Sequence, residues 1–240
     1  MLCVECGRPV NTLYTEYSKG NIRLTPCDAC GRFVDKYVEL DFVVIFIDLL
    51  LHKPQVYRHL LFNRLEYYDK GFHPSVAKLA VLLVLFDVYI RWYRLERYYA
   101  DVMPEFFSHN ALVQYVYLLL LCVIELCVFH IVTRWLVWLW FYKRHPIINY
   151  NYLSMALTIS SFSKLLLILM VIWDYSRLEY ARVLGLFEIT SNLEAISVFL
   201  GSNLKATLPI LVAGVAARWL TQYVFIQLTG NIIPFGIITT

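Results

Sequence analysis

Hydrophobic residues are distributed unevenly along this chain, and their pattern divides it into three parts. Residues 1–36 consist of short polar stretches punctuated by glycine and proline, which predicts a compact, loop-rich module. Residues 37–72 contain short apolar runs broken by charge, as in YVELDFVVIFIDLLL, and this pattern favours helices that lie on a membrane surface. From residue 73 to residue 240, long apolar runs predict a transmembrane bundle.

The third part contains several segments that approach the length of about 20 apolar residues needed to cross a bilayer. The predicted spans cover residues 75–93, 112–132, 152–173 and 206–228. Residues 183–200 carry Glu188, Asn192 and Glu194, so they are interpreted as a poor span, a re-entrant segment or a surface helix. The expected fold class is therefore an all-α polytopic membrane protein with four or five transmembrane helices.

Composition strengthens the membrane interpretation and excludes one class of partner. Of the 240 residues, 60% are hydrophobic and 16% are charged, whereas soluble proteins contain about 25% charged residues. The mean hydropathy is +0.59. The formal net charge is only +3, from 21 basic and 18 acidic residues. This charge is too small and too dispersed for nucleic-acid binding, so no nucleic-acid partner is expected.

The most specific local pattern is a repeated cysteine pair. Cys3-x-x-Cys6 and Cys27-x-x-Cys30 each end on a glycine, which permits the positive φ that such a turn often requires. Two intervening residues let both sulfurs of a pair converge on one ion, and two pairs complete a tetrahedral shell. We therefore predict a structural zinc ion in a small zinc-ribbon-like module. A rubredoxin-type iron site and a redox-active pair are the alternatives.

Sequence motifs for catalysis are missing. The six histidines show no H-x-x-x-H or H-E-x-x-H arrangement, and the chain has no Gly-x-Ser-x-Gly elbow or phosphate-binding glycine loop. Cys122 and Cys127 would project about 140° apart on a helix, which indicates packing and not a second metal site. A closed four-thiolate centre also leaves no position for a substrate. We expect that the protein is not an enzyme.

Ionisable residues inside the predicted spans require compensation, because each costs on the order of 2.5–3.5 kcal/mol on insertion scales. Glu125 and Lys164 lie near the middle of their spans. Consecutive antiparallel helices would place these residues at the same depth, so we predict that they pair. Such charges either fix helix packing or line a cleft for a lipid headgroup.

The first quarter of the chain resembles the Arv family of endoplasmic-reticulum membrane proteins. The resemblance rests on the paired C-x-x-C-G knuckles, the stretch VDKYVELD, and the stretch DLLLHKPQVYRHLLFN. It covers residues 1–64 specifically and extends further only in hydropathy. It implies a role in sterol homeostasis and sphingolipid balance, and in the delivery or presentation of glycosylphosphatidylinositol intermediates.

The resemblance also implies residue roles. It assigns zinc to Cys3, Cys6, Cys27 and Cys30. Further candidates for lipid or partner contact, two of them taken from the spans, are Tyr57, Arg58, His59, Asn63, Glu125 and Lys164. Arg58 and His59 would sit near lipid phosphates if residues 37–62 lie along the membrane, and the alternative is that they pack against the knuckles. Because zinc thiolates survive in a reducing compartment, the module is expected in the cytosol.

Three classes of function fit these observations. The first is a protein that binds and moves or presents membrane lipids, namely sterol and glycolipid. The second is a non-catalytic scaffold for enzymes that synthesise glycosylphosphatidylinositol or sphingolipid. The third is a membrane enzyme without a recognisable motif, which the missing motifs disfavour.

Overall fold

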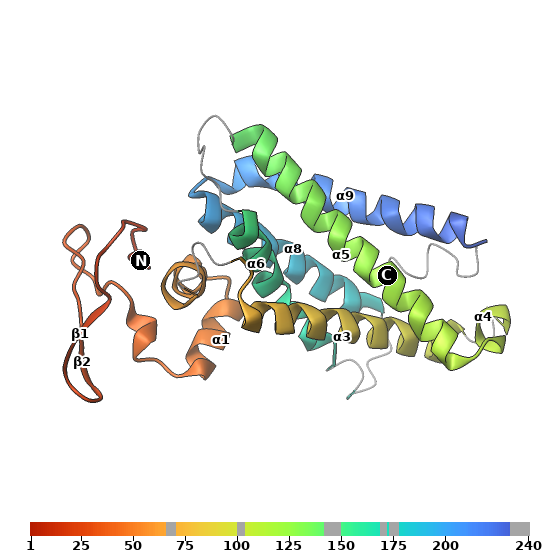
Figure 1. Ribbon diagram of the computed structural model, residues 1–240, viewed down its shortest axis with the longest axis horizontal. Helices are drawn as coiled ribbons and strands as arrows, with labels where there is room; N and C mark the ends of the chain where they lie inside the picture. Colours follow the sequence, from red (N-terminus) through yellow and green to blue (C-terminus); the bar gives the residue numbers. More distant parts are fainter. Residues whose placement is uncertain (66–70, 100–103, 142–149, 169–171, 173–177, 231–240) are drawn as a thin grey trace.

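The computed structural model describes residues 1–65, 71–99, 104–141, 150–168, 172 and 178–230. A small β-containing module lies at one end of the molecule, and the long helices form a bundle beside it (Figure 1). The short helices of residues 36–64 lie between these two parts.

The N-terminal module contains one antiparallel hairpin and two loops. Strands β1 (Tyr14–Ser18) and β2 (Asn21–Leu24) pair across a turn at Gly20, whose φ is +82°. Isolated bridges between Leu2 and Pro9 and between Pro26 and Phe33 close one loop before the hairpin and one after it. The hairpin thus separates two similar loops and brings them side by side.

Four short helices connect the module to the bundle. They are the 3-10 helix η1 (Lys36–Val38), α1 (Phe42–Leu50), α2 (Pro54–Arg58) and the π-helical turn η2 (His59–Arg64). Helix α1 ends before His52, which has a φ of +51°, and Pro54 opens α2 at a position where proline needs no hydrogen-bond partner. Several large apolar side chains of α1 and its C-cap stay exposed: Phe42, Val43, Val44, Ile47 and Leu51.

The bundle consists of long helices joined by shorter ones. Its members are α3 (Pro74–Tyr99), α4 (Pro104–Ser108), α5 (Ala111–Phe141), α6 (Tyr150–Ser160), the 3-10 helix η3 (Ser161–Leu167), α8 (Leu178–Leu200) and α9 (Leu204–Leu228). Helices α5 and α9 approach closely at Gly214, where an added Cβ would lie 3.0 Å from the Thr133 hydroxyl oxygen. Small residues at such crossings allow the close helix contacts that are typical of membrane bundles.

Three of the described helices are long and apolar enough to cross a membrane: α5, residues 183–200 of α8, and α9. Residues 183–200, which the sequence left as a poor span, a re-entrant segment or a surface helix, are therefore among them. The predicted span 75–93 lies within α3, which carries Lys78, Asp87 and Arg91 and is not among the three. The total of four or five spans stays a prediction.

The predicted span 152–173 is not one continuous α-helix. Helix α6 changes to the tighter η3 after Ser160, and part of the predicted segment lies outside the described residues. The hydroxyls of Ser160 and Ser161 both donate to the Leu157 carbonyl oxygen. Serine side chains that bond the backbone in this way compete with the regular helical pattern.

One hydrophobic core joins the module, the connecting helices and the bundle. It contains Val4 from the first loop, Tyr57 and Leu61 from the connecting helices, and Phe162 and Ala195 from the bundle. Val4, Tyr57, Leu61 and Ala195 have no measurable exposure. Residues 1–36 are thus packed onto the rest of the protein and do not stand apart as a separate unit.

Candidate metal centre and polar clusters

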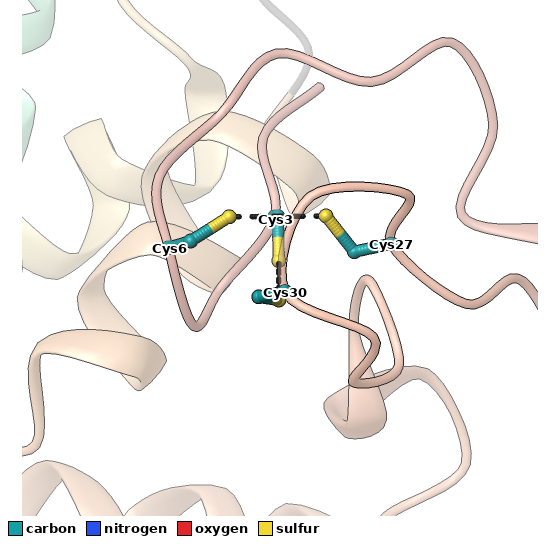
Figure 2. Close-up of side chains that lie close together, drawn as sticks. All are labelled: Cys3, Cys6, Cys27 and Cys30. Atoms are coloured by element: carbon teal, nitrogen blue, oxygen red, sulfur yellow. Dashed lines mark hydrogen bonds between the residues drawn. The ribbon is translucent and has the colours of Figure 1, made fainter.

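The four cysteines of the module point toward a common centre (Figure 2). The Sγ atoms of Cys3 and Cys30 lie 3.8 Å apart, as do those of Cys6 and Cys27, and all four sulfurs lie within 4.8 Å of one another. A zinc–sulfur distance of about 2.3 Å requires sulfurs about 3.8 Å apart in a tetrahedron. The spacing of the thiols therefore fits one tetrahedral metal ion.

The two cysteine loops have the same backbone design. In each loop, the glycine after the second cysteine donates its N–H to the carbonyl of the first cysteine, at 2.9 Å for Gly7 and 2.8 Å for Gly31. Both glycines have positive φ, +74° and +71°, as the sequence predicts. The first cysteine of each loop in turn donates to an arginine carbonyl, Cys3 to Arg8 and Cys27 to Arg32. Each loop is thus a metal knuckle whose turn requires glycine.

The surroundings of Cys3 and Cys27 shift the pKa values of these two thiols in opposite directions. Burial raises the pKa of the Cys3 thiol to about 12. Backbone N–H groups of Ala29 and Cys30 lower the pKa of the Cys27 thiol to about 7. A bound divalent cation favours the thiolate form of all four groups. Four thiolates with this spacing are the donor set of a structural zinc site, so the residues present fit zinc.

Arg58 and Asn63 hold the first knuckle against the connecting helices. The Arg58 guanidinium donates to the carbonyl oxygens of Val4 and Glu5, at 2.7 and 3.0 Å. The Asn63 side chain accepts from the Leu2 N–H at 2.8 Å and donates to the Leu2 carbonyl at 2.9 Å. These contacts fix the backbone on both sides of Cys3, and with it the position of the metal centre.

A buried aspartate lies at the centre of the same contact region. Asp35 has no measurable exposure, and its Oδ2 lies 2.7 Å from the His59 Nδ1 and accepts from the Asn63 side chain at 2.6 Å. Its Oδ1 accepts from the Tyr37 N–H. Sequence reasoning missed Asp35 as a site residue. Its position at the start of the VDKYVELD stretch was the signal that could have found it.

Tyr57 and Asp48 of the connecting helices make three further polar contacts. The Tyr57 hydroxyl is 2.8 Å from the Ser191 hydroxyl of α8, and burial raises the pKa of Tyr57 to about 12. The Asp48 carboxylate accepts from the Tyr37 hydroxyl at 2.8 Å and from the Lys53 ammonium at 2.7 Å. Burial alone would raise the pKa of Asp48, but these hydrogen bonds bring it below its usual value.

The structure therefore places the four candidate residues of the connecting helices in the contact region between the module and the bundle. These residues are Tyr57, Arg58, His59 and Asn63. Arg58 and His59 pack against the knuckle region, as the alternative interpretation expected. Contact of these residues with a lipid or a partner stays a prediction.

The bundle contains a second polar cluster. Its members come from α3, α5, η3, α8 and α9, and they are three cations and three anions: Asp87, Arg91, Glu125, Lys164, Glu188 and Arg218. Arg91 donates to both oxygens of Glu125, at 2.7 and 2.8 Å, and Glu125 also accepts from Arg218 at 3.2 Å. The bidentate Arg91–Glu125 pair is the strongest contact of the cluster.

Glu125 and Lys164 do not form the ion pair that their depth in the spans predicts. Lys164 instead lies 3.5 Å from both Asp87 and Glu188, and among the described residues Glu125 forms ion pairs with Arg91 and Arg218. Both residues nevertheless line one cavity of about 40 Å³. The prediction identified the right region but the wrong partners. Helix α3 supplies both partners: Arg91 pairs with Glu125, and Asp87 pairs with Lys164.

The fold and the site together define a class of protein. The described part of the chain is mostly helical, contains three helices that could cross a membrane, and has an N-terminal four-cysteine centre able to hold a metal ion. The model of the Arv1-like family matches residues 2–196, far beyond the first 64 residues on which the resemblance rested. The chain belongs to the Arv1-like family.

Similar proteins occur across the eukaryotes. The chain is 40% identical to Protein arv1 homolog of Dictyostelium discoideum over 92% of this chain and 94% of that protein. It is 39% identical to Protein arv1 of Schizosaccharomyces pombe, with 96% and 87% covered, and 31% identical to Protein ARV1 of Homo sapiens, with 93% and 81% covered. No solved structure matches the chain. Membership of this family indicates a protein of sterol and lipid homeostasis.

Proposed function

We propose that this protein resides in the endoplasmic-reticulum membrane and maintains sterol and lipid balance by binding lipids and moving or presenting them. The observation that carries the proposal is the family match, which includes the metal module, the connecting helices and most of the bundle. The lipids would be sterols and glycolipids, including glycosylphosphatidylinositol intermediates. Sphingolipid balance would follow from the same activity.

The zinc module would serve this function structurally. A zinc ion held by four thiolates has no open coordination position, so its role would be to fold residues 1–36. Arg58, Asn63 and the Asp35–His59 pair would then transmit the position of that module to the connecting helices. We place the module on the cytosolic side, where a reducing environment preserves zinc thiolates.

We also propose that the protein acts without catalysis. Two features support this proposal. A zinc ion held by the four thiolates would have no open position, and the six charged side chains of the bundle cluster are paired with one another across five elements. Ion pairs of this kind stabilise a helical arrangement in an apolar environment, where unpaired charges are costly.

A specific observation favours a second candidate, a scaffold for enzymes that synthesise glycosylphosphatidylinositol or sphingolipid. The module exposes three large aromatic side chains, of which Tyr17 is 67%, Phe33 57% and Tyr14 43% exposed. Exposed aromatic residues are enriched at protein interfaces. A partner enzyme would therefore contact the hairpin side of the module.

Reconstitution of the purified, zinc-loaded protein in liposomes separates these functions. A carrier is expected to move a fluorescent sterol or a labelled glycolipid between vesicles without any other protein. The control is the same protein with its zinc removed by a chelator. A scaffold would transfer neither lipid and would co-purify with an enzyme complex, and a covalently altered lipid would contradict the proposal that the protein is not an enzyme.

A further inference from the structure

An apolar cavity of about 590 Å³ lies between the connecting helices and the bundle. Its walls come from α1, η2, α3, the end of α6, and η3. The apolar residues that matter here are Phe46, Leu49, Val76, Leu79, Phe162 and Leu165. Cavities of about 300–1,000 Å³ with mostly apolar walls are typical of small-molecule sites. The cavity is therefore large enough for part of a lipid.

The cavity lies beside an exposed apolar surface on α1. Phe42 lines the cavity and is 70% exposed, and its neighbours on α1, Val43 and Ile47, are 63% and 48% exposed. Exposed apolar side chains of this size on a short helix are expected to insert into a membrane surface. Phe42 thus belongs both to the exposed apolar surface and to the wall of the cavity, so a hydrocarbon chain could enter the cavity beside it.

A second, more polar hollow of about 760 Å³ adjoins the first. Its walls include Asn11, Thr12 and Glu16 of the module, and it shares Phe42, Ile45 and Arg64 with the apolar cavity. The hydroxyl, amide and carboxylate groups of the module can form hydrogen bonds with a hydroxylated headgroup. The two hollows thus form one amphipathic site, with an apolar part and a polar part.

Arg64 stands where the two parts meet. Its side chain lines both hollows and is exposed. Among the described residues it has no salt-bridge or hydrogen-bond partner, whereas Arg58, Arg91 and Arg218 are all bonded. A guanidinium presents several N–H donors in a planar fork that matches a phosphate group. The charge is therefore available to an anionic group at the boundary.

We propose that these two hollows bind a glycerophospholipid with a hydroxylated headgroup, of the phosphatidylinositol type. The acyl chains lie in the apolar cavity, the phosphate lies on Arg64, and the headgroup lies against the module. This inference rests on the proposed lipid-binding function and names its ligand class. A sterol would fill the apolar part but would leave Arg64 and the polar hollow without a partner.

The test is photo-crosslinking of the full chain in phosphatidylcholine nanodiscs. The probe is a phosphatidylinositol that carries a diazirine in one acyl chain and an alkyne tag, and the labelled peptides are identified by mass spectrometry. The expected labels lie on α1, η2 and η3. Arg64→Gln should reduce labelling by about fivefold to tenfold, and Arg64→Lys should retain more of it.

Matched variants separate the site from general effects. Leu79→Trp fills the apolar cavity and should abolish labelling, whereas Leu82→Trp on the same helix should not, because Leu82 is 50% exposed and does not line the cavity. Arg23→Gln removes an exposed arginine from the hairpin and should leave labelling unchanged. Zinc content and the thermal midpoint verify that each variant is folded. Because Arg64 is exposed, Arg64→Gln requires no repacking of the protein interior.

Three results would overturn the inference. They are labels confined to other helices, labelling that does not respond to Arg64→Gln, and a photoactivatable sterol that labels the same residues as strongly as the phosphatidylinositol probe. The first and third results would leave the proposed function intact, because the protein would still bind a lipid. A failure of both the phospholipid and the sterol probe to label the wild-type protein would contradict the proposed function as well.

Discussion

The four-cysteine centre and the ion cluster of the bundle are both built from ionisable side chains, but the charges of these side chains are neutralised in different ways. In the module, four thiols share one small volume and need an added cation. In the bundle, three cations and three anions neutralise one another, with Glu125 at the centre and 2% exposed. The module should therefore depend on a metal, whereas the bundle should depend on keeping its ion pairs complete.

Removal of one thiolate is the substitution with the largest expected effect. Cys27→Ser should release the zinc ion and unfold the module, because structural zinc contributes about 10–16 kcal/mol of apparent binding energy in small zinc peptides. Zinc per chain, measured by elemental analysis, should fall from one to near zero. Cys127→Ser is the matched control, since Cys127 is an exposed cysteine of α5. Full zinc content in Cys27→Ser would contradict the four-thiolate site.

Loss of one ion partner in the bundle should have the next largest effect. Arg91→Gln leaves Glu125 and Asp87 without their main cation, and breaking a buried pair costs about 3–5 kcal/mol. The measurement is thermal unfolding in detergent micelles, with Lys78→Gln as an exposed control on α3. Adding Glu125→Gln should restore part of the lost stability. Strictly additive effects of the two substitutions would contradict the pairing.

Asn63 connects the module to the connecting helices, and its loss should have an intermediate effect. Asn63→Ala removes three hydrogen bonds, two to Leu2 and one to Asp35, and leaves the Asp35 carboxylate with fewer donors. The expected loss of stability is about 2–3 kcal/mol. Limited proteolysis should show earlier cleavage before residue 36. Asn21→Ala, at an exposed position in the hairpin, should cleave like the wild type.

The smallest expected effect is a pH dependence at Asp48. Its folded-state pKa is lowered, so its contribution to stability is present above the unfolded pKa of about 4 and is lost as the pH falls through the folded pKa. Acid also protonates the thiolates, so the useful measurement is the difference in thermal midpoint between wild type and Asp48→Asn. That difference should shrink between pH 7 and pH 3. A constant difference would show that the charge of Asp48 does not matter.

The sequence predicted the module far better than the bundle. Cys3-x-x-Cys6 and Cys27-x-x-Cys30 are local patterns whose geometry follows from two intervening residues and a glycine. The four thiols could therefore be assigned to one metal site without knowledge of the tertiary structure. The family and the positive φ of Gly7 and Gly31 were also predicted correctly. Arg58 and Asn63 belong to a recognised stretch, yet their backbone partners in the first knuckle depend on tertiary packing.

The ion partners in the bundle could not be read from the sequence. The depth of Glu125 and Lys164 along their helices was predicted well enough, since both residues line one cavity. The rotation of each helix about its axis decides which charges meet, and it depends on close contacts such as the one at Gly214. The Asp87-x-x-x-Arg91 spacing was visible as an i, i+4 pair, and it is the local signal that would have improved the prediction.

We propose that this protein is stabilised by zinc, binds membrane lipid and does not alter that lipid chemically. The most direct test of this proposal is native mass spectrometry of the full chain released from nanodiscs that contain endoplasmic-reticulum lipids. We expect one zinc ion per chain and at least one retained lipid, whose mass after extraction equals that of the lipid supplied. A chain that carries zinc but retains no lipid, or a retained lipid with a changed covalent structure, would contradict the proposal.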